Sequence, residues 1–360
     1  MKNMKQWINP AIRARRAYHV PPAGDLIKLD AMENPYSWPE SLKPAWHEKL
    51  DAIALNRYPD PEALHLKHKL RKSLAVPDNT AILLGNGSDE IIQVLAVALS
   101  GTDRYYLAPE PSFVMYRHIT EILNVGYCGV QLSPPDFGLD QAAMVAAIKK
   151  YQPALVFIAW PNNPTGNLFD QAAVLEVIRH APGLVVIDEA YHAFSGESFI
   201  SRLEEFENLL VMRTFSKSGL AGIRLGFLLG EASVLEELEK VRLPYNINSL
   251  TQATAEFMIE HADVLDDQIR HIRAGREILL AELTRMPGIQ VWPSAANFIL
   301  FRFQNRNAAE VFSGLRQRGV LIKNLHGGHP LLENCLRVTV GTEAENRTFL
   351  EALQQLLVAA

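Results

Sequence analysis

Short apolar runs alternate with amphipathic stretches along most of the first 226 residues, and this alternation constrains the fold more than any other feature. Strands are predicted at residues 81–84, 105–107, 127–130, 154–159, 184–187 and 209–212. Helices are predicted between them at residues 62–73, 91–99, 111–123, 141–150 and 171–179. Strands that are apolar on both faces and separated by helices are typical of parallel sheets. We therefore predict an α/β fold with a mostly parallel sheet covered by helices on both faces.

The pattern changes after Gly226. Helices are predicted at residues 232–242, 250–285, 308–318 and 343–358, and strands at 290–292, 298–303, 320–322 and 336–340. This mixture predicts a second, smaller α+β domain, for which a chain of 360 residues has room. We expect residues 46–255 to form the large domain and residues 256–360 the small one. Residues 1–45 would be an N-terminal arm and part of the small domain.

Charge and cysteine content narrow the possible partners and compartments. The net charge of -5 argues against nucleic acid or an anionic membrane as the main partner. No apolar run approaches the ~20 residues of a membrane helix. Two cysteines, Cys128 and Cys335, cannot form a disulfide framework and are typical of buried thiols in a reducing compartment. The basic residues 1–16 could be a transit peptide, but they lack serine and contain Trp7, so we expect a surface arm and a cytoplasmic protein.

A lysine follows the last apolar strand of the alternating region. Lys217 comes shortly after residues 209–212, lies between serines, and precedes Arg224 by seven residues. At the end of a strand, in a turn walled by apolar residues, desolvation lowers the pKa of a lysine and makes its amine nucleophilic. The alternative is an ordinary solvated lysine in a loop rich in serine and glycine.

Polar side chains also follow three other predicted strands, where ligands of open α/β sheets bind. The segment Gly85-Asn-Gly87-Ser88-Asp89-Glu90 leads into a helix whose N-terminus favours a phosphate, although Ser88 or Asp89 could be a plain helix cap. Its spacing is not G-x-G-x-x-G, so no dinucleotide is expected. Asn163 follows the predicted strand at residues 154–159 and offers an amide, unless it only forms a turn.

Asp188 ends another apolar strand, and Tyr191 follows three residues later. A buried carboxylate needs a cationic partner, which could be a structural salt bridge or a ligand. We expect no metal, because no cluster of His, Cys and Asp has ligand spacing. Pyridoxal phosphate requires the groups that these four loops offer together. They are an anion cradle, an amide, a carboxylate with a phenol, and an activated lysine with an arginine.

Several motifs are similar to those of known families. Asn163-Pro-Thr-Gly, Asp188-Glu-Ala-Tyr and Ser216-Lys, followed by Ala221-Gly-Ile-Arg-Leu-Gly, resemble fold type I aminotransferases. The segments at residues 28–36, 57–61 and 329–342 more narrowly resemble histidinol-phosphate aminotransferases, and the likeness runs nearly from end to end.

The resemblance implies a role for each matching residue. Lys217 would form the Schiff base with the cofactor and move the substrate proton, Asp188 would face the ring nitrogen, and Tyr191 would contact the ring oxygen; these are the expected catalytic residues. The other expected cofactor-binding residues are Gly87, Ser88, Asp89, Phe113, Asn163, Thr214, Ser216, Arg224 and, from the neighbouring subunit, Tyr58. Phe113 would stack on the ring, unless it is a core aromatic.

The resemblance also implies substrates and an assembly. Arg337 would hold the α-carboxylate of glutamate and, in the other half-reaction, the phosphate of histidinol phosphate. Tyr18 and Lys323 would face the same phosphate, and Asn297 would lie on the substrate side. Because Tyr58 would reach the other subunit, the resemblance implies a homodimer with shared active sites.

The expected reaction exchanges histidinol phosphate and 2-oxoglutarate for imidazole acetol phosphate and glutamate, a step of histidine biosynthesis. The alternatives are an aromatic amino acid aminotransferase, a threonine-phosphate decarboxylase, or a cofactor-binding protein without turnover. The chain departs from the family in three places. The spacing from Lys217 to Arg224 is one residue shorter than in many relatives, Lys323 stands where arginine is frequent, and Met32 replaces a frequent asparagine, so no contact with the site is expected from Met32.

Overall fold

A computed structural model describes residues 4–15, 17, 22–101, 103 and 105–358 of the chain. Its largest sheet has seven strands in the order β2-β8-β7-β6-β5-β3-β4. These strands are β2 (Thr80–Gly85), β3 (Tyr105–Glu110), β4 (Gly126–Gln131), β5 (Leu155–Ala159), β6 (Leu184–Asp188), β7 (Leu209–Thr214) and β8 (Gly226–Glu231). All neighbours are parallel except β8, which is antiparallel to both β2 and β7. The predicted mostly parallel sheet is confirmed, and β8 is an addition to it.

Helices cover both faces of this sheet, as predicted. They are α3 (Leu64–Ser73), α4 (Gly87–Ala98), α5 (Val114–Ile122), α6 (Gln141–Tyr151), α7 (Gln171–His180), α9 (Ala232–Glu239) and α10 (Ser249–Glu260). Alternate residues of one strand serve opposite faces: Val211 packs in the core with residues of α6 and α7, and Met212 in the core with residues of α4 and α5. Strands buried on both faces leave only their ends free to carry polar residues.

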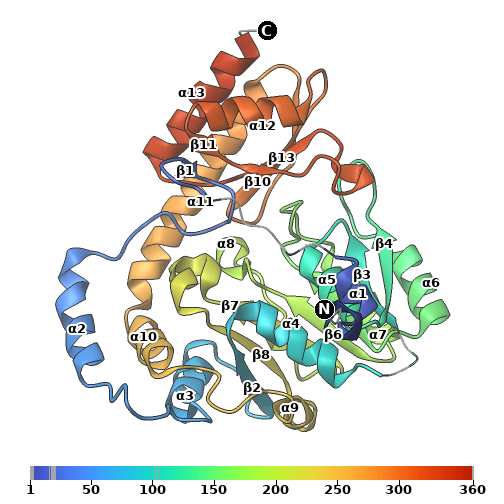
Figure 1. Cartoon of the computed structure of the whole chain (residues 1–360), viewed down its shortest axis with the longest axis vertical. Coiled ribbons are helices and arrows are strands. Elements are labelled where there is room, and N and C mark those ends of the chain that lie inside the picture. The colour runs from blue at the N-terminus through green and yellow to red at the C-terminus, as the bar shows by residue number, and fades with distance from the viewer. Residues whose placement is uncertain (1–3, 16, 18–21, 102, 104, 359–360) are drawn as a thin grey trace.

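A second sheet has four antiparallel strands in the order β12-β13-β10-β9. These are β9 (Ile289–Val291), β10 (Phe298–Phe303), β12 (Lys323–Asn324) and β13 (Cys335–Thr339). The helices α11 (Ala262–Arg285), α12 (Ala308–Gln317) and α13 (Glu343–Val358) accompany it. Figure 1 shows this sheet above the seven-stranded sheet, with α11 running down from one to the other.

The N-terminal part of the described chain packs against this second sheet. Strand β1 (Ile27–Lys28) pairs in parallel with β11 (Val320–Leu321), and Leu29 and Met32 belong to the same core as β10 and β13. From β1 the chain descends past α2 (Lys43–Asp51) to α3 (Figure 1). The remaining short elements are α1 (Pro10–Arg13), α8 (His192–Ser195), a π-helical turn at Ser216–Leu220, and 3-10 turns at Met4–Trp7, Glu40–Leu42, Ile200–Arg202, Ala221–Ile223 and Pro330–Leu332.

The helical region predicted at residues 250–285 consists of two helices, α10 and α11. The break falls at His261, whose φ of -118° and ψ of 37° are not helical. Its ring Nδ1 lies 2.8 Å from the carbonyl oxygen of Phe257, so the side chain takes the place of the helical N–H there. None of the described helices is long and apolar enough to cross a membrane.

A buried ion pair joins the ends of β6 and β7. Arg213 Nη2 lies 2.7 Å from Glu189 Oε2, and neither side chain is accessible to more than a trace of solvent. Ser198 Oγ donates to the same carboxylate at 3.0 Å, and the backbone N–H of Phe199 donates to its other oxygen. Burial raises the pKa of Glu189, and Arg213 opposes that rise. The pair fixes the two strand ends that carry Asp188 and Thr214.

Candidate active site

A pocket lies where β5, β6 and β7 end, below the second sheet. It is lined by Met32, Ser88, Asp89, Phe113, Ala159, Asn163, Asp188, Ala190, Tyr191, Thr214, Ser216, Lys217 and Arg224. The structure therefore brings together nearly all residues that the sequence predicted to bind a cofactor. The carboxyl ends of parallel strands meet at one edge of the sheet, which explains how residues more than one hundred positions apart converge.

Lys217 lies in the loop between β7 and β8. Phe215 N donates to Leu225 O at 3.0 Å, which closes the base of the loop, and Lys217 sits in a single wide turn at residues 216–220. Its Nζ donates to Ala31 O at 3.2 Å. Burial, and after it the nearby guanidinium of Arg337, lower the pKa of Lys217 to about 8. An appreciable fraction of this amine is therefore uncharged near neutral pH and can act as a nucleophile.

Asp188 is held at the end of β6 by two hydrogen bonds. Tyr116 donates its hydroxyl to Oδ2 at 2.5 Å, and Ala190 N donates to Oδ1 at 3.0 Å. Burial raises the pKa of Asp188 to about 6, and both hydrogen bonds act against that rise. Tyr116 also stacks on Phe157, with ring centroids 4.5 Å apart. The sequence analysis missed Tyr116; its position three residues after Phe113, within the helix predicted at residues 111–123, is the signal that could have found it.

We expect Tyr116→Phe to raise the pKa of Asp188. The substitution removes a hydrogen bond that favours the carboxylate, and such bonds to charged groups contribute about 1.5–3 kcal/mol, which corresponds to roughly 1–2 pH units. Carbon-13 NMR of aspartate carboxyl groups in the cofactor-free protein measures this pKa directly, with Tyr106→Phe as a control because the Tyr106 hydroxyl donates to Ala96 O instead. An unchanged Asp188 pKa in Tyr116→Phe would contradict the assignment.

The N-terminus of α4 and the loop that carries Lys217 together form an anion cradle. Arg224, with a left-handed φ of 51°, directs Nη1 to Ser216 Oγ at 3.3 Å and Nη2 to Asp89 Oδ2 at 3.5 Å. Gly87 has a φ of 78°, and a Cβ there would lie 2.8 Å from Arg224 Nη2. The seven-residue spacing from Lys217 therefore still returns the arginine to the pocket. Guanidinium, hydroxyls and helix N-terminus converge as an anion requires.

Arg337 connects this pocket to a neighbouring cleft. Its Nη1 donates to Asn163 Oδ1, and its Nη2 donates to Asp30 O at 3.1 Å. Asn163 Nδ2 in turn donates to the hydroxyl of Tyr191 at 3.2 Å. The cleft has a volume of ≈ 500 Å³ and is lined by residues that include Phe113, Asn163, Lys323, His329 and Arg337. Lys323 on β12 is the register partner of Arg337 on β13, so two cations stand side by side. Burial, together with Arg337, lowers the pKa of Lys323.

Tyr18 falls outside the described residues, and three others lie differently from the rest of the predicted set. Tyr58 is 79% exposed and stacks on Tyr245, with centroids 4.4 Å apart, away from its own chain's pocket. Asn297 is fully buried behind Met32 and donates to Met32 O at 2.9 Å. Met32, contrary to expectation, lines both pocket and cleft. Its φ of 55° is set by Asn297 and by Thr339, whose hydroxyl accepts from Met32 N at 3.0 Å.

The described residues fit pyridoxal phosphate. The pocket supplies an amine of lowered pKa, a buried carboxylate for a ring nitrogen, an amide and a phenol for a ring oxygen, and a cradle for a phosphate. The space that a Cβ would fill at Gly87 is needed by Arg224 of the cradle. Within the described ranges, no group of three or more His, Cys, Asp and Glu side chains could hold a metal ion.

Comparisons with known proteins agree with this fit. The family pattern "Aminotransferase class I and II" matches residues 24–353. Histidinol-phosphate aminotransferase 2 of Nitrosococcus oceani is 55% identical over 97% of each chain, and histidinol-phosphate aminotransferase of Chromobacterium violaceum is 48% identical over 99% of each.

Solved structures show the same fold. Histidinol-phosphate aminotransferase from Sinorhizobium meliloti, in complex with pyridoxal-5'-phosphate, superimposes with a TM-score of 0.86 over 98% of each chain at 23% identity. The enzyme from Clostridium acetobutylicum gives a TM-score of 0.85 at 24% identity, covering 92% of this chain and 99% of that one. L-threonine-O-3-phosphate decarboxylase from Porphyromonas gingivalis also matches, with a TM-score of 0.78 at 24% identity, covering 92% of this chain and 99% of that one. Their fold, that of fold type I aminotransferases, is the fold of this chain.

Proposed function

The chain belongs to the histidinol-phosphate aminotransferases, within the class I and II aminotransferases, and we propose from this premise how its residues perform the reaction. The reaction is transamination between histidinol phosphate and 2-oxoglutarate, which gives imidazole acetol phosphate and glutamate in histidine biosynthesis. One observation carries the residue assignment: the amine of Lys217 and the carboxylate of Asp188 share a pocket that adjoins a cleft with two cations, Arg337 and Lys323.

The enzyme depends on pyridoxal phosphate, which when bound supplies an electron sink for the charge left by the departing substrate proton. Lys217 is the covalent attachment point and the base that moves this proton. Asp188 holds the proton on the ring nitrogen, and Tyr191 with Asn163 donates to the ring oxygen. Phe113 covers one face of the ring. The cradle residues Gly87, Ser88, Asp89, Thr214, Ser216 and Arg224 hold the phosphate.

Arg337 and Lys323 recognise the anionic ends of the two substrates. Arg337 lines the cleft and is bonded to Asn163, which lines both pocket and cleft, so its planar guanidinium can pair with the α-carboxylate of glutamate in one half-reaction and with the phosphate of histidinol phosphate in the other. Lys323, beside it, adds a second charge on the phosphate. Tyr18 is proposed for the same phosphate by resemblance alone, and Asn297 acts through the backbone of Met32.

Substrate preference tests this function against its rivals of the same fold. Steady-state kcat/KM should be far higher for histidinol phosphate than for phenylalanine, because the cleft offers two cations and phenylalanine has no phosphate. A preference for phenylalanine would identify an aromatic amino acid aminotransferase. Release of carbon dioxide from threonine phosphate would identify a decarboxylase.

We expect Arg337→Lys to weaken substrate recognition more than turnover. Lysine keeps the charge but loses the paired N–H groups, and a lost hydrogen bond to a charged group reduces kcat/KM by roughly 10–100-fold for both glutamate and histidinol phosphate. Most of this change should appear in KM. Arg306→Lys is the matched control, because Arg306 donates only to the carbonyls of Leu356 and Leu357 in the described structure. An unchanged KM for both substrates would remove Arg337 from this role.

We also propose a homodimer in which Tyr58 enters the partner's site. Support comes from Tyr58 itself, which is exposed and stacks on Tyr245. Exposed leucines flank both tyrosines along the chain: Leu55 and Leu64 near Tyr58, and Leu243 and Leu250 near Tyr245. Sedimentation at micromolar concentration should show a species of twice the 40.2 kDa chain mass.

The proposed compartment is the cytoplasm, in keeping with free thiols at Cys128, which is half-buried, and Cys335, which is buried.

A further inference from the structure

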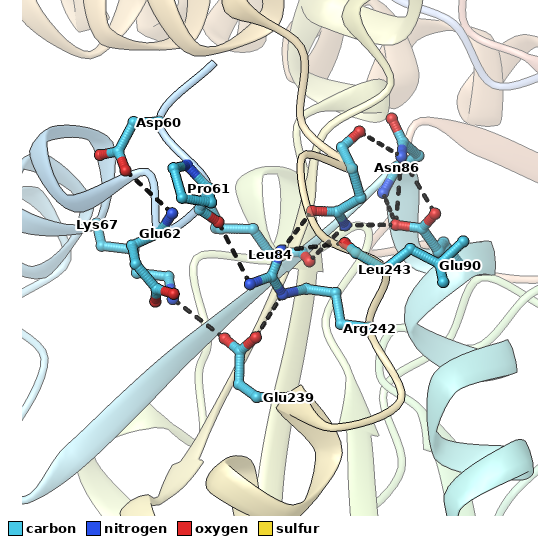
Figure 2. Close-up of polar contacts among 11 residues, drawn as sticks. Asp60, Pro61, Glu62, Lys67, Leu84, Asn86, Glu90, Glu239, Arg242 and Leu243 are labelled. Atoms are coloured by element: carbon cyan, nitrogen blue, oxygen red, sulfur yellow. Dashed lines mark hydrogen bonds and ion pairs between the residues drawn. The ribbon is translucent and has the colours of Figure 1, made fainter. Parts of the chain in front are cut away.

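A network of hydrogen bonds joins the anion cradle to residues that follow Tyr58 (Figure 2). It begins at Glu90, in the first turn of α4. Glu90 Oε2 accepts from Asn86 N at 2.7 Å and from Asn246 Nδ2 at 2.8 Å. Its other oxygen, Oε1, accepts from Asn86 Nδ2 at 3.1 Å. Asn246 Nδ2 also donates to Leu84 O at 3.2 Å, so the segment around Asn246 is bound to the end of β2.

These contacts hold the side chain of Asn86 away from the helix that it precedes. Asn248 and Asn307 cap α10 and α12, because each accepts a backbone N–H of the first turn. Asn86 is the corresponding residue of α4, but within the described structure its side chain makes no such bond. Its amide instead donates to Glu90 and, at 2.8 Å, to Asn246 O. The first-turn N–H groups beside Ser88 and Asp89 are thereby left for an anion in the pocket.

The other half of the network runs from Asn246 to the segment that carries Tyr58. Arg242 Nη1 donates to Asn246 Oδ1 at 2.8 Å, and Nη2 donates to Pro61 O at 3.3 Å. Its Nε pairs with Glu239, which Lys67 on α3 also contacts at 3.2 Å. The side chain of Arg242 is only 9% exposed, although its bond to Pro61 O lies at an exposed position.

Two further contacts hold the same segment in place. Gln252 Nε2 donates to Asp60 O at 2.9 Å, and Tyr58 stacks on Tyr245, one residue before Asn246. The backbone at residues 60–61 is therefore fixed by Arg242 and Gln252. Tyr58, two residues earlier, is directed outward on this fixed base.

We propose that Glu90 and Arg242 are positioning residues for the cofactor phosphate in two different subunits. Glu90 keeps the N-terminus of α4 open for the phosphate bound by its own chain. Arg242 holds the Tyr58 segment in place for the phosphate bound by the partner. Through Asn246 the two residues belong to one network, so each cradle is linked to the segment that its chain lends to the partner. The second half of this proposal rests on the proposed dimer.

The role of Glu90 is tested with the full chain freed of cofactor and titrated with two ligands, pyridoxal phosphate and pyridoxal. Glu90→Gln places a donor where two amide donors already converge. We expect the dissociation constant for pyridoxal phosphate to rise ~10-fold and that for pyridoxal to stay unchanged. In the double variant Glu90→Gln, Asn246→Asp, the amide introduced at position 90 can donate to the carboxylate introduced at position 246, the reverse of the wild-type bond. This should restore part of the affinity for pyridoxal phosphate.

Two results would overturn the role of Glu90. Equal weakening of both ligands would indicate a general structural defect, and unchanged affinity for pyridoxal phosphate would show that the cradle does not need Glu90. Glu237→Gln is the control, because Glu237 is an exposed residue paired with Lys240.

The role of Arg242 is tested in mixed dimers. One subunit carries Lys217→Ala and cannot be labelled at that position, so borohydride trapping at increasing pyridoxal phosphate reports only the other site. When Arg242→Gln is placed in the Lys217→Ala subunit, labelling of the intact site should require a ~10-fold higher concentration of pyridoxal phosphate. When Arg242→Gln is placed in the intact subunit, this concentration should change much less. If Arg242→Gln does not fold, Arg242→Lys, which keeps the charge but cannot make all the contacts, takes its place.

Tyr58→Phe, placed in the same mixed dimers, separates the two levels of the proposal. If Tyr58→Phe has no effect across the subunits, the shared active site itself is wrong. If Tyr58→Phe acts across the subunits and Arg242→Gln does not, the dimer stands and the positioning role of Arg242 is overturned.

Discussion

Lys217→Ala is expected to lower kcat by at least ~10³-fold, because it removes the residue proposed both as the covalent attachment point and as the base that moves the substrate proton. The lowered pKa of about 8 suits Lys217 to both tasks near neutral pH. Single-turnover and steady-state rates with histidinol phosphate measure the loss. Borohydride treatment followed by peptide mapping should label the peptide that contains Lys217 in the wild type and leave it unlabelled in the variant.

Lys49→Ala is a suitable control, since Lys49 lies on α2 and lines neither the pocket nor the cleft among the described residues. Its rate and its labelling pattern should match the wild type. A label on another lysine in the wild-type protein, or full turnover in Lys217→Ala, would remove the central assignment.

Arg213→Met is expected to lower the free energy of unfolding by ~3–5 kcal/mol, the largest stability effect that the structure suggests for a single substitution. It leaves Glu189 buried without its cation, and breaking one partner of a buried pair is strongly destabilising. Urea unfolding of the cofactor-free protein, followed by tryptophan fluorescence at a fixed protein concentration, measures the change.

The loss in Arg213→Met should depend on pH in one direction. Without Arg213 to oppose it, burial raises the pKa of Glu189 further above its ordinary value of 4.5. A carboxyl whose pKa is raised in the folded state favours folding most below its unfolded pKa, and this stability is lost as the pH rises through its folded pKa. The stability of the variant should therefore be closest to that of the wild type below about pH 4.5 and furthest below it near neutral pH.

Adding Glu189→Gln to Arg213→Met removes the unpaired charge and should recover part of the stability. Arg179→Met, which breaks an exposed pair with Glu176, should have little effect. If Arg213→Met were no more destabilising than Arg179→Met, the buried pair would not be what fixes the strand ends.

The sequence predicted the large sheet and most of the site because both depend on short-range patterns. Apolar runs identify buried strands, and polar residues such as Asp188 and Lys217 that directly follow such runs must lie at one edge of a parallel sheet. Strand β8 was not predicted because its apolar run is short and bounded by glycines. It is nevertheless the strand that returns the chain after Arg224 and closes the loop around Lys217.

The residues that the sequence could not identify depend on contacts between distant segments. Met32 faces the site because Asn297 and Thr339 hold its backbone in a left-handed conformation, and nothing local to Met32 indicates this. The network from Glu90 to Arg242 joins positions about 150 residues apart along the chain, and its members resemble ordinary surface residues when taken singly. Such pairings follow from the packing of whole elements, which local patterns do not encode.

Two contacts that complete the site, from Met32 N to Thr339 Oγ1 and from Arg337 to Asp30 O, each span 307 positions of the chain. At about 5–20 residues per second, a ribosome takes roughly 15–60 s to make the second partner after the first. During that interval the seven-stranded sheet, whose strands all precede residue 232, can already form. The newly made protein therefore passes through a stage with a folded scaffold and an incomplete binding site. Asp30 and Met32 gain their partners on β13 only after that strand has been synthesised, and substrate binding depends on this step.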